Sequence, residues 1–76
     1  MNRHDLDLAI EEHDEHIGTC RYFSGQAVDT EDAMLYFDNL SPGDREKIDE
    51  AVSLLREVAD RHDERAKQLD EEYGPL

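Results

Sequence analysis

Apolar residues recur at helical spacing along most of the chain, and their pattern predicts three helices. Between about residues 3 and 17 they recur every three or four positions, the period of a helix with one buried face. Gly18 either ends this helix as a left-handed cap or is tolerated within it at a cost of about 1 kcal/mol. The apolar stripe consists of Leu6, Ala9, Ile10, His13 and Ile17.

A second helix is expected over residues 30–40, after a loop that contains the sequence SGQ. Asp29 or Thr30 is suited to be its N-cap, and the acids that follow complement the positive end of the helix dipole. Asn39 and Leu40 close this helix. Its apolar face is formed by Ala33, Met34, Phe37 and Leu40.

The third helix is expected over residues 42–73. Ser41 is placed as its N-cap, Pro42 takes the first helical position, and Asp44 is placed for a bond of the capping-box type. At 1.5 Å per residue this helix is about 45 Å long, more than a small globule needs. Its second half therefore projects, packs on the first helix or pairs with another chain. Steps of four and three define a heptad seam of Ile48, Val52, Leu55, Ala59, His62, Ala66, Leu69 and Tyr73.

The expected fold is all-α: a small three-helix protein with a long C-terminal helix, forming a single domain over residues 1–76. A chain of this length buries only about 60% of its unfolded surface. Such a domain is marginally stable alone, so it leans on a partner or on dimerisation. A homodimer is one of the expected assemblies.

The net charge changes the picture of the partners. Twenty-one acids against eight bases give −13. Direct nucleic-acid binding, which needs a basic surface, is excluded, and anionic membranes are disfavoured. The negative charge instead favours binding to basic partners or to multivalent cations, or it serves solubility. Asp slightly outnumbers Glu, and Arg outnumbers Lys. This bias is also typical of a GC-rich genome or a salt-adapted host.

The cellular location follows from what the sequence lacks. The single cysteine cannot form an internal disulfide, which favours a reducing cytoplasm. No apolar run approaches the roughly 18 residues of a membrane span, and the N-terminus lacks the apolar core of a signal peptide. The expected location is cytoplasmic.

Two histidines and a cysteine in HDEHIGTC raise the possibility of zinc. His13, His16 and Cys20 share a face if the helix continues through Gly18, and His4 or His62 would complete four ligands. Paired CxxC motifs and HExxH are absent, so ordinary core or boundary positions are the favoured reading. We therefore expect no metal, no cofactor and no catalytic residue. An activated thiolate is disfavoured among so many carboxylates.

The placement of the acids is the main functional signal. On the first helix, acids four residues apart form a like-charge ladder, which local stability disfavours by a few tenths of a kcal/mol per step. Asp14, which flanks the ladder, and Glu15 also lie near the expected C-terminal end of the first helix, where the dipole disfavours anions. A second acidic cluster lies in the same position at the end of the third helix. Charges placed against local rules are candidates for function. The expected partner-binding residues are Asp7, Glu11, Glu12, Asp14, Glu15, Asp70, Glu71 and Glu72.

A rigid acidic ridge of this kind suits a channel lined with lysine and arginine, because neighbouring carboxylates lie about 5–6 Å apart and DNA also presents its charges in rows. In size, charge and helical content the whole chain resembles small phage-encoded acidic inhibitors, which include DNA-mimic and some anti-CRISPR proteins. The resemblance lies in composition and matches no motif. It implies a protein acting in the host cytoplasm on a basic, nucleic-acid-binding protein or complex.

We therefore expect a non-enzymatic acidic protein that binds and inhibits such a partner, with mimicry of rows of DNA phosphates as the expected mode. The alternative is a helical interaction or assembly module. In that case the heptad seam of the third helix joins another chain, and the acids serve solubility.

Overall fold

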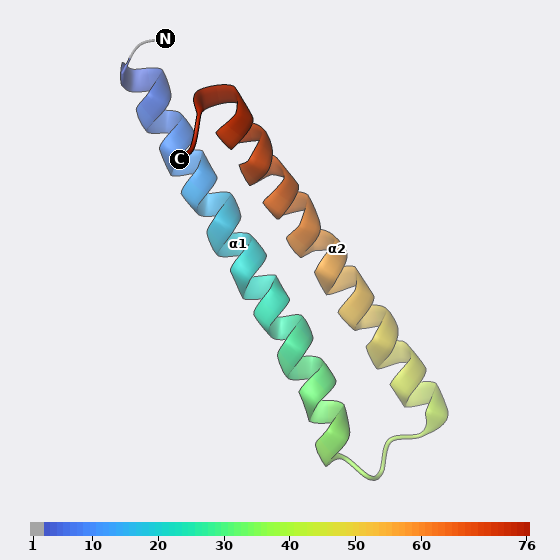
Figure 1. Cartoon of the computed structure of the whole chain (residues 1–76). Coiled ribbons are helices and arrows are strands. Elements are labelled where there is room, and N and C mark those ends of the chain that lie inside the picture. Colours follow the sequence, from blue (N-terminus) through green and yellow to red (C-terminus); the bar gives the residue numbers. More distant parts are fainter. Residues whose placement is uncertain (1–2) are drawn as a thin grey trace.

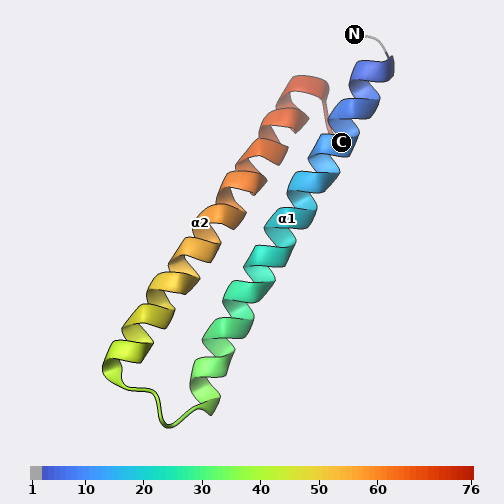
Figure 2. The same ribbon diagram turned by 180° about the vertical axis from the view of Figure 1, so that it is seen from behind.

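The structure, a computed structural model, describes residues 3–76, so Met1 and Asn2 of the predicted domain lie outside it. It consists of two long helices, α1 (Arg3–Tyr36) and α2 (Pro42–Tyr73), joined by residues 37–41. The helices lie side by side and run in opposite directions, so the start of α1 and the end of α2 are at the same end of the molecule (Figures 1 and 2). The Cα trace of this hairpin measures 57 × 15 × 14 Å.

The prediction of an all-α fold is consistent with this structure, but the prediction of three helices is wrong. The first expected helix does not end at Gly18. It continues through Gly25 to Tyr36, so the expected loop is helical. The expected second helix, 30–40, is divided between the last turns of α1 and the connection. Thr30 is no N-cap, because its hydroxyl donates to the Gln26 carbonyl at 2.7 Å inside the helix.

A heptad seam along α1 explains why the helix passes both glycines. Its positions alternate in steps of three and four without interruption, which keeps one stripe facing α2. Each glycine costs about 1 kcal/mol relative to alanine, a local penalty that tertiary packing of the long stripe outweighs. The seam consists of Leu6, Ala9, His13, His16, Cys20, Phe23, Ala27, Thr30 and Met34.

α2 covers the predicted range and begins as its sequence indicates. The Ser41 hydroxyl accepts a hydrogen bond from the Asp44 backbone nitrogen at 3.0 Å, and an Asp44 carboxylate oxygen accepts one from the Ser41 nitrogen at 3.2 Å. These two bonds satisfy donors that would otherwise be unpaired at the helix start. The Arg45 side chain donates to the Phe37 carbonyl at 3.3 Å and so ties the connection to α2.

The core between the helices is narrow and built largely from small residues. Of the described residues, six apolar ones are buried, and four of these six are alanines. Alanines allow the helices to approach but remove little surface from water, so each contributes little. Leu69, at 1% exposed, is the largest fully buried side chain. The six are Ala9, Ala27, Val52, Ala59, Ala66 and Leu69.

The predicted seam of the long C-terminal helix packs against α1 of the same chain. Its members Val52, Ala59, Ala66 and Leu69 are buried there. Of the three possibilities that the sequence left open, packing on the first helix is therefore the one observed. In the assembly alternative, this seam would have to meet another chain in place of α1. Neither described helix is long and apolar enough to cross a membrane.

Candidate functional site at the acidic end of the hairpin

The antiparallel arrangement brings both predicted acidic clusters to the same end of the molecule. We call residues 3–18 and 60–76 the terminal half, and residues 19–59, which include the connection, the loop half. Figure 2 shows the start of α1 beside the end of α2 in the terminal half. Near the border between the two halves, the rings of His16 of α1 and His62 of α2 contact each other across the seam.

The terminal half carries more of the charge. It holds twelve acids and the four bases Arg3, Arg61, Arg65 and Lys67, which gives a net charge of −8. The loop half holds nine acids and four bases, which gives −5. The negative charge is therefore densest where the start of α1 lies beside the end of α2.

Five of the eight predicted contact residues are exposed, and their carboxylates make no ion pair or hydrogen bond with any described residue. They are Asp7, Glu11, Glu15, Glu71 and Glu72. Asp14 is exposed too, with one carboxylate oxygen 3.8 Å from Nδ1 of His13. Because α1 continues to Tyr36, Asp14 and Glu15 lie far from a helix end, and the expected conflict with the helix dipole does not arise there.

Glu12 differs from these because it is paired with residues of the same chain, although its side chain stays partly exposed. Its Oε1 atom accepts from Nε of Arg65 at 3.1 Å and lies 3.1 Å from Nη2 of the same guanidinium. It also lies 3.5 Å from Nε2 of His16. Arg65 therefore neutralises a carboxylate that appears unpaired along the first helix in the sequence.

Asp70 also has intramolecular contacts. Its Oδ1 atom lies 3.2 Å from Nε2 of His13 and accepts a hydrogen bond from the Leu76 backbone nitrogen at 3.0 Å. The carboxylate thus fastens the end of the chain and links it to α1. Gly74, with a φ of 85°, allows the chain to turn back after the helix. Asp70 stabilises the terminal half and is poorly placed to meet a partner.

The histidines form polar contacts within the seam. The Nδ1 atoms of His16 and His62 are 2.7 Å apart, so one ring donates its Nδ1–H and the Nδ1 atom of the other accepts. The ring centroids are 5.0 Å apart and the rings are tilted by 33°. Nδ1 of His13 is buried without a hydrogen-bond partner in the described structure. The sequence places these residues on apolar stripes, but their partners depend on the register between the helices.

The three candidate zinc ligands are not brought together. His16 faces His62, His13 faces Asp70, and the sulfur of Cys20 lies 4.0 Å from the Ser24 hydroxyl. Over residues 3–76, no group of three or more His, Cys, Asp or Glu residues has an arrangement that could hold a metal ion.

The remaining ion pairs are peripheral. Arg56 of α2 contacts Glu31 of α1, and Lys67 lies 3.1 Å from Asp63 on the same helix. The hydrogen bond and charge of Asp63 raise the pKa of Lys67. Exposed pairs of this kind contribute little to stability.

Comparison with known proteins adds no relative, since neither a family model, nor a curated protein, nor a solved structure matches the chain.

Proposed function

We propose that this chain is a non-enzymatic acidic protein that binds a basic, nucleic-acid-handling protein and inhibits it by occupying the surface that nucleic acid would use. The observation that carries the proposal is the row of exposed carboxylates of Asp7, Glu11 and Glu15, which no described residue pairs, in the more negative half of the molecule. A protein of this kind would act in the cytoplasm, where such partners work.

The charge density of the terminal half supports the proposal. Its sixteen residues of α1 extend about 24 Å at 1.5 Å per residue. A net charge of −8 over this length is about one charge per 3 Å. Double-stranded DNA carries one charge per roughly 1.7 Å, and each of its strands one per roughly 3.4 Å. The loop half, with −5 over about 27 Å of helix, carries about one per 5 Å, so only the terminal half has a nucleic-acid-like density.

The spacing of the exposed row is also suitable. Asp7, Glu11 and Glu15 follow one another at four-residue steps, which is about 6 Å along the helix axis. This is close to the distance between every second phosphate on one strand, about 6.8 Å. Because the row belongs to a continuous helix, its order is already fixed before binding, and less conformational entropy is lost on association.

Competitive capture tests this function directly. The immobilised chain is exposed to a lysate of its native cell at low salt, and retained proteins are eluted with a short DNA duplex. We expect a basic protein that is released by the duplex. Its retention should fall steeply with salt, because exposed charges are screened beyond about 8 Å at physiological ionic strength.

A pair of matched variants distinguishes a specific ridge from general acidity. Glu11→Lys/Glu15→Lys reverses two exposed acids of the terminal half, and Asp29→Lys/Asp32→Lys reverses two exposed acids of the loop half. Both variants change the net charge equally. We expect the first to weaken retention at least tenfold and the second to stay within about twofold, a difference of roughly 1 kcal/mol or more. Equal effects of the two variants would indicate that the acids serve only solubility or salt adaptation.

A further inference from the structure

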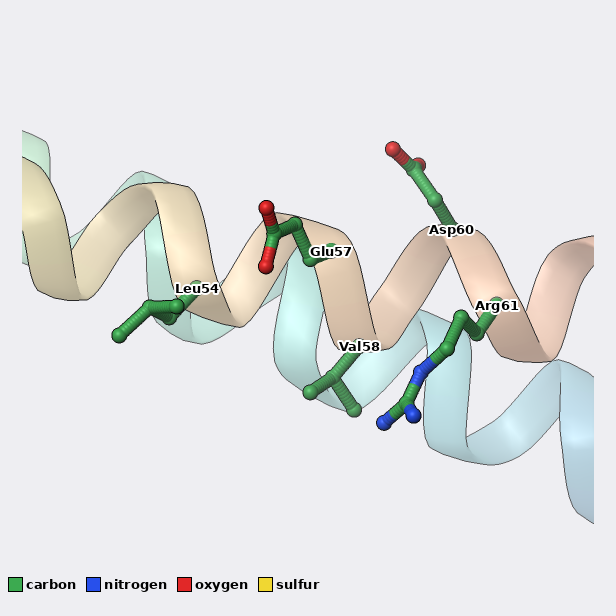
Figure 3. A pocket seen from close by; sticks show the side chains of 5 residues that line it. All are labelled: Leu54, Glu57, Val58, Asp60 and Arg61. Atoms are coloured by element: carbon green, nitrogen blue, oxygen red, sulfur yellow. The ribbon is translucent and has the colours of Figure 1, made fainter.

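α2 carries a second apolar stripe that does not face α1. Ala51 and Leu54 are exposed and Val58 is half-buried, and the Leu54 side chain is 54% exposed. With Glu57, Asp60 and Arg61, Leu54 and Val58 line an open groove of about 500 Å³ on α2 (Figure 3). A helix with three apolar positions per seven residues is typical of a bundle, in which it meets more than one neighbour.

The side of the hairpin on which this stripe lies is fixed by an ion pair. Ala51, Val58 and Arg65 are each seven residues apart and therefore occupy the same position around α2. Arg65 contacts Glu12, so the stripe lies on the side of the hairpin marked by that pair. We call the surface of Ala51, Leu54 and Val58 the Leu54 flank.

Two cations accompany this flank and lack partners. Lys47 and Arg61 are separated by two heptads and so lie on the same face of α2 as Leu54, which is seven residues from each. Neither makes an ion pair with a described residue, although acids greatly outnumber bases in the chain. Glu50 and Glu64, also two heptads apart, are exposed beside them. Such a pattern of charges is complementary to the same pattern on a helix that runs in the opposite direction.

We propose that the Leu54 flank is the interface of a two-fold symmetric homodimer, in which α2 of each copy lies antiparallel on α2 of the other and the two hairpins form a four-helix bundle. In a two-fold contact the same patch meets itself. Pairing Leu54 of one copy near Val58 of the other brings Arg61 opposite Glu50 and Lys47 opposite Glu64. Each unpaired cation on the flank thereby gains a carboxylate.

A second copy also suits the rest of the molecule. Among residues 3–76 only one large side chain, that of Leu69, is fully buried, so a core this narrow benefits from further apolar burial. The antiparallel orientation places the −8 terminal half of each copy beside the −5 loop half of the other, which keeps the two most acidic regions apart. A parallel pairing would bring them together and is disfavoured by repulsion.

Molar mass in solution tests the interface. At about 100 µM in physiological salt, a concentration at which a micromolar dimer is nearly complete, light scattering should give twice 8.8 kDa. Leu54→Glu should give a monomer with unchanged helix content, because Leu54 is outside the seam. Val28→Glu is the matched control: Val28 is 50% exposed but lies on α1 away from the flank, so the dimer should remain.

A charge swap tests the antiparallel pairing. Arg61→Glu and Glu50→Arg should each weaken the dimer at least tenfold, and the double variant should restore it to within about threefold of the natural chain. If the natural chain is a monomer in solution, the proposal is wrong, even if a different protein is found to bind the flank. A dimer that survives Leu54→Glu, or that Val28→Glu dissociates, overturns it too. A double variant that stays weak overturns the antiparallel pairing.

Discussion

Replacing Gly18 and Gly25 with alanine should stabilise the protein, because both residues lie inside one continuous helix. A Cβ atom built at either position has no neighbour within 4 Å, so the new methyl groups meet no obstacle. Alanine is favoured over glycine in a helix interior by about 0.8–1 kcal/mol. The two positions are seven residues, about 10 Å, apart, so their effects should add.

The double variant should therefore gain about 1.5–2 kcal/mol in the free energy of unfolding. For a domain of 60–100 residues, 1 kcal/mol shifts the midpoint of thermal unfolding by about 4–8 °C. The expected rise is about 6–16 °C, measured by circular dichroism at one fixed protein concentration, because dimerisation would make the midpoint depend on concentration.

Gly74→Ala provides the opposite control, since its φ of 85° is unfavourable for any residue with a Cβ atom. This substitution should lower stability by about 1–2 kcal/mol. If instead Gly18 were a left-handed cap ending a short helix, Gly18→Ala would also be destabilising. A melting temperature that is unchanged or lowered by Gly18→Ala would thus refute the continuous α1.

Two further predictions test the seam. Leu69→Ala removes the largest fully buried side chain and should cost about 2–5 kcal/mol, whereas Leu35→Ala, at a residue 79% exposed, should cost under about 0.5 kcal/mol; similar urea midpoints for both would contradict the packing of α2 on α1. His16→Ala and His62→Ala should show a coupling of about 0.5–1.5 kcal/mol in a double-mutant cycle at pH 8, because their rings share a hydrogen bond; strictly additive effects would contradict that contact.

The sequence predicts α2 well because its local signals agree with its long-range pattern. The capping box at Ser41 starts the helix where the heptad seam begins, and the seam continues to Tyr73. α1 is harder to predict because its signals conflict. Gly18 and Gly25 favour a break, and polar residues such as His16 and Thr30 occupy positions where a seam is normally apolar. The continuous heptad becomes visible only once the seam of α2 is known to need a partner.

The candidate site could be located only in part, for a related reason. The sequence identifies which stretches are acidic, but the pairing of an acid across helices depends on their register. Glu12 appears unpaired along α1 and is neutralised by Arg65, 53 residues away. Asp70 is likewise engaged by His13. Conversely, the proximity of the two acidic clusters follows from the antiparallel packing of α1 and α2. The expected three-helix arrangement left the relative direction of these two helices open.

The acids of the terminal half affect folding and binding in opposite directions. Asp7, Glu11 and Glu15 repel one another at four-residue steps, which costs roughly 0.2–0.5 kcal/mol per pair. Arg65 offsets part of the negative field from the edge of the seam, but the exposed row keeps its repulsion. Glu11→Lys/Glu15→Lys turns the repulsion between Asp7 and position 11 into an attraction and leaves positions 11 and 15 with like charges. It should therefore raise the free energy of unfolding by about 0.4–1 kcal/mol, while the same variant loses the basic partner. A chain selected only for stability would not keep such a row, so a variant that is both steadier and inactive would identify binding as the reason for its presence. Loss of stability together with binding would instead mean that the acids are part of the fold.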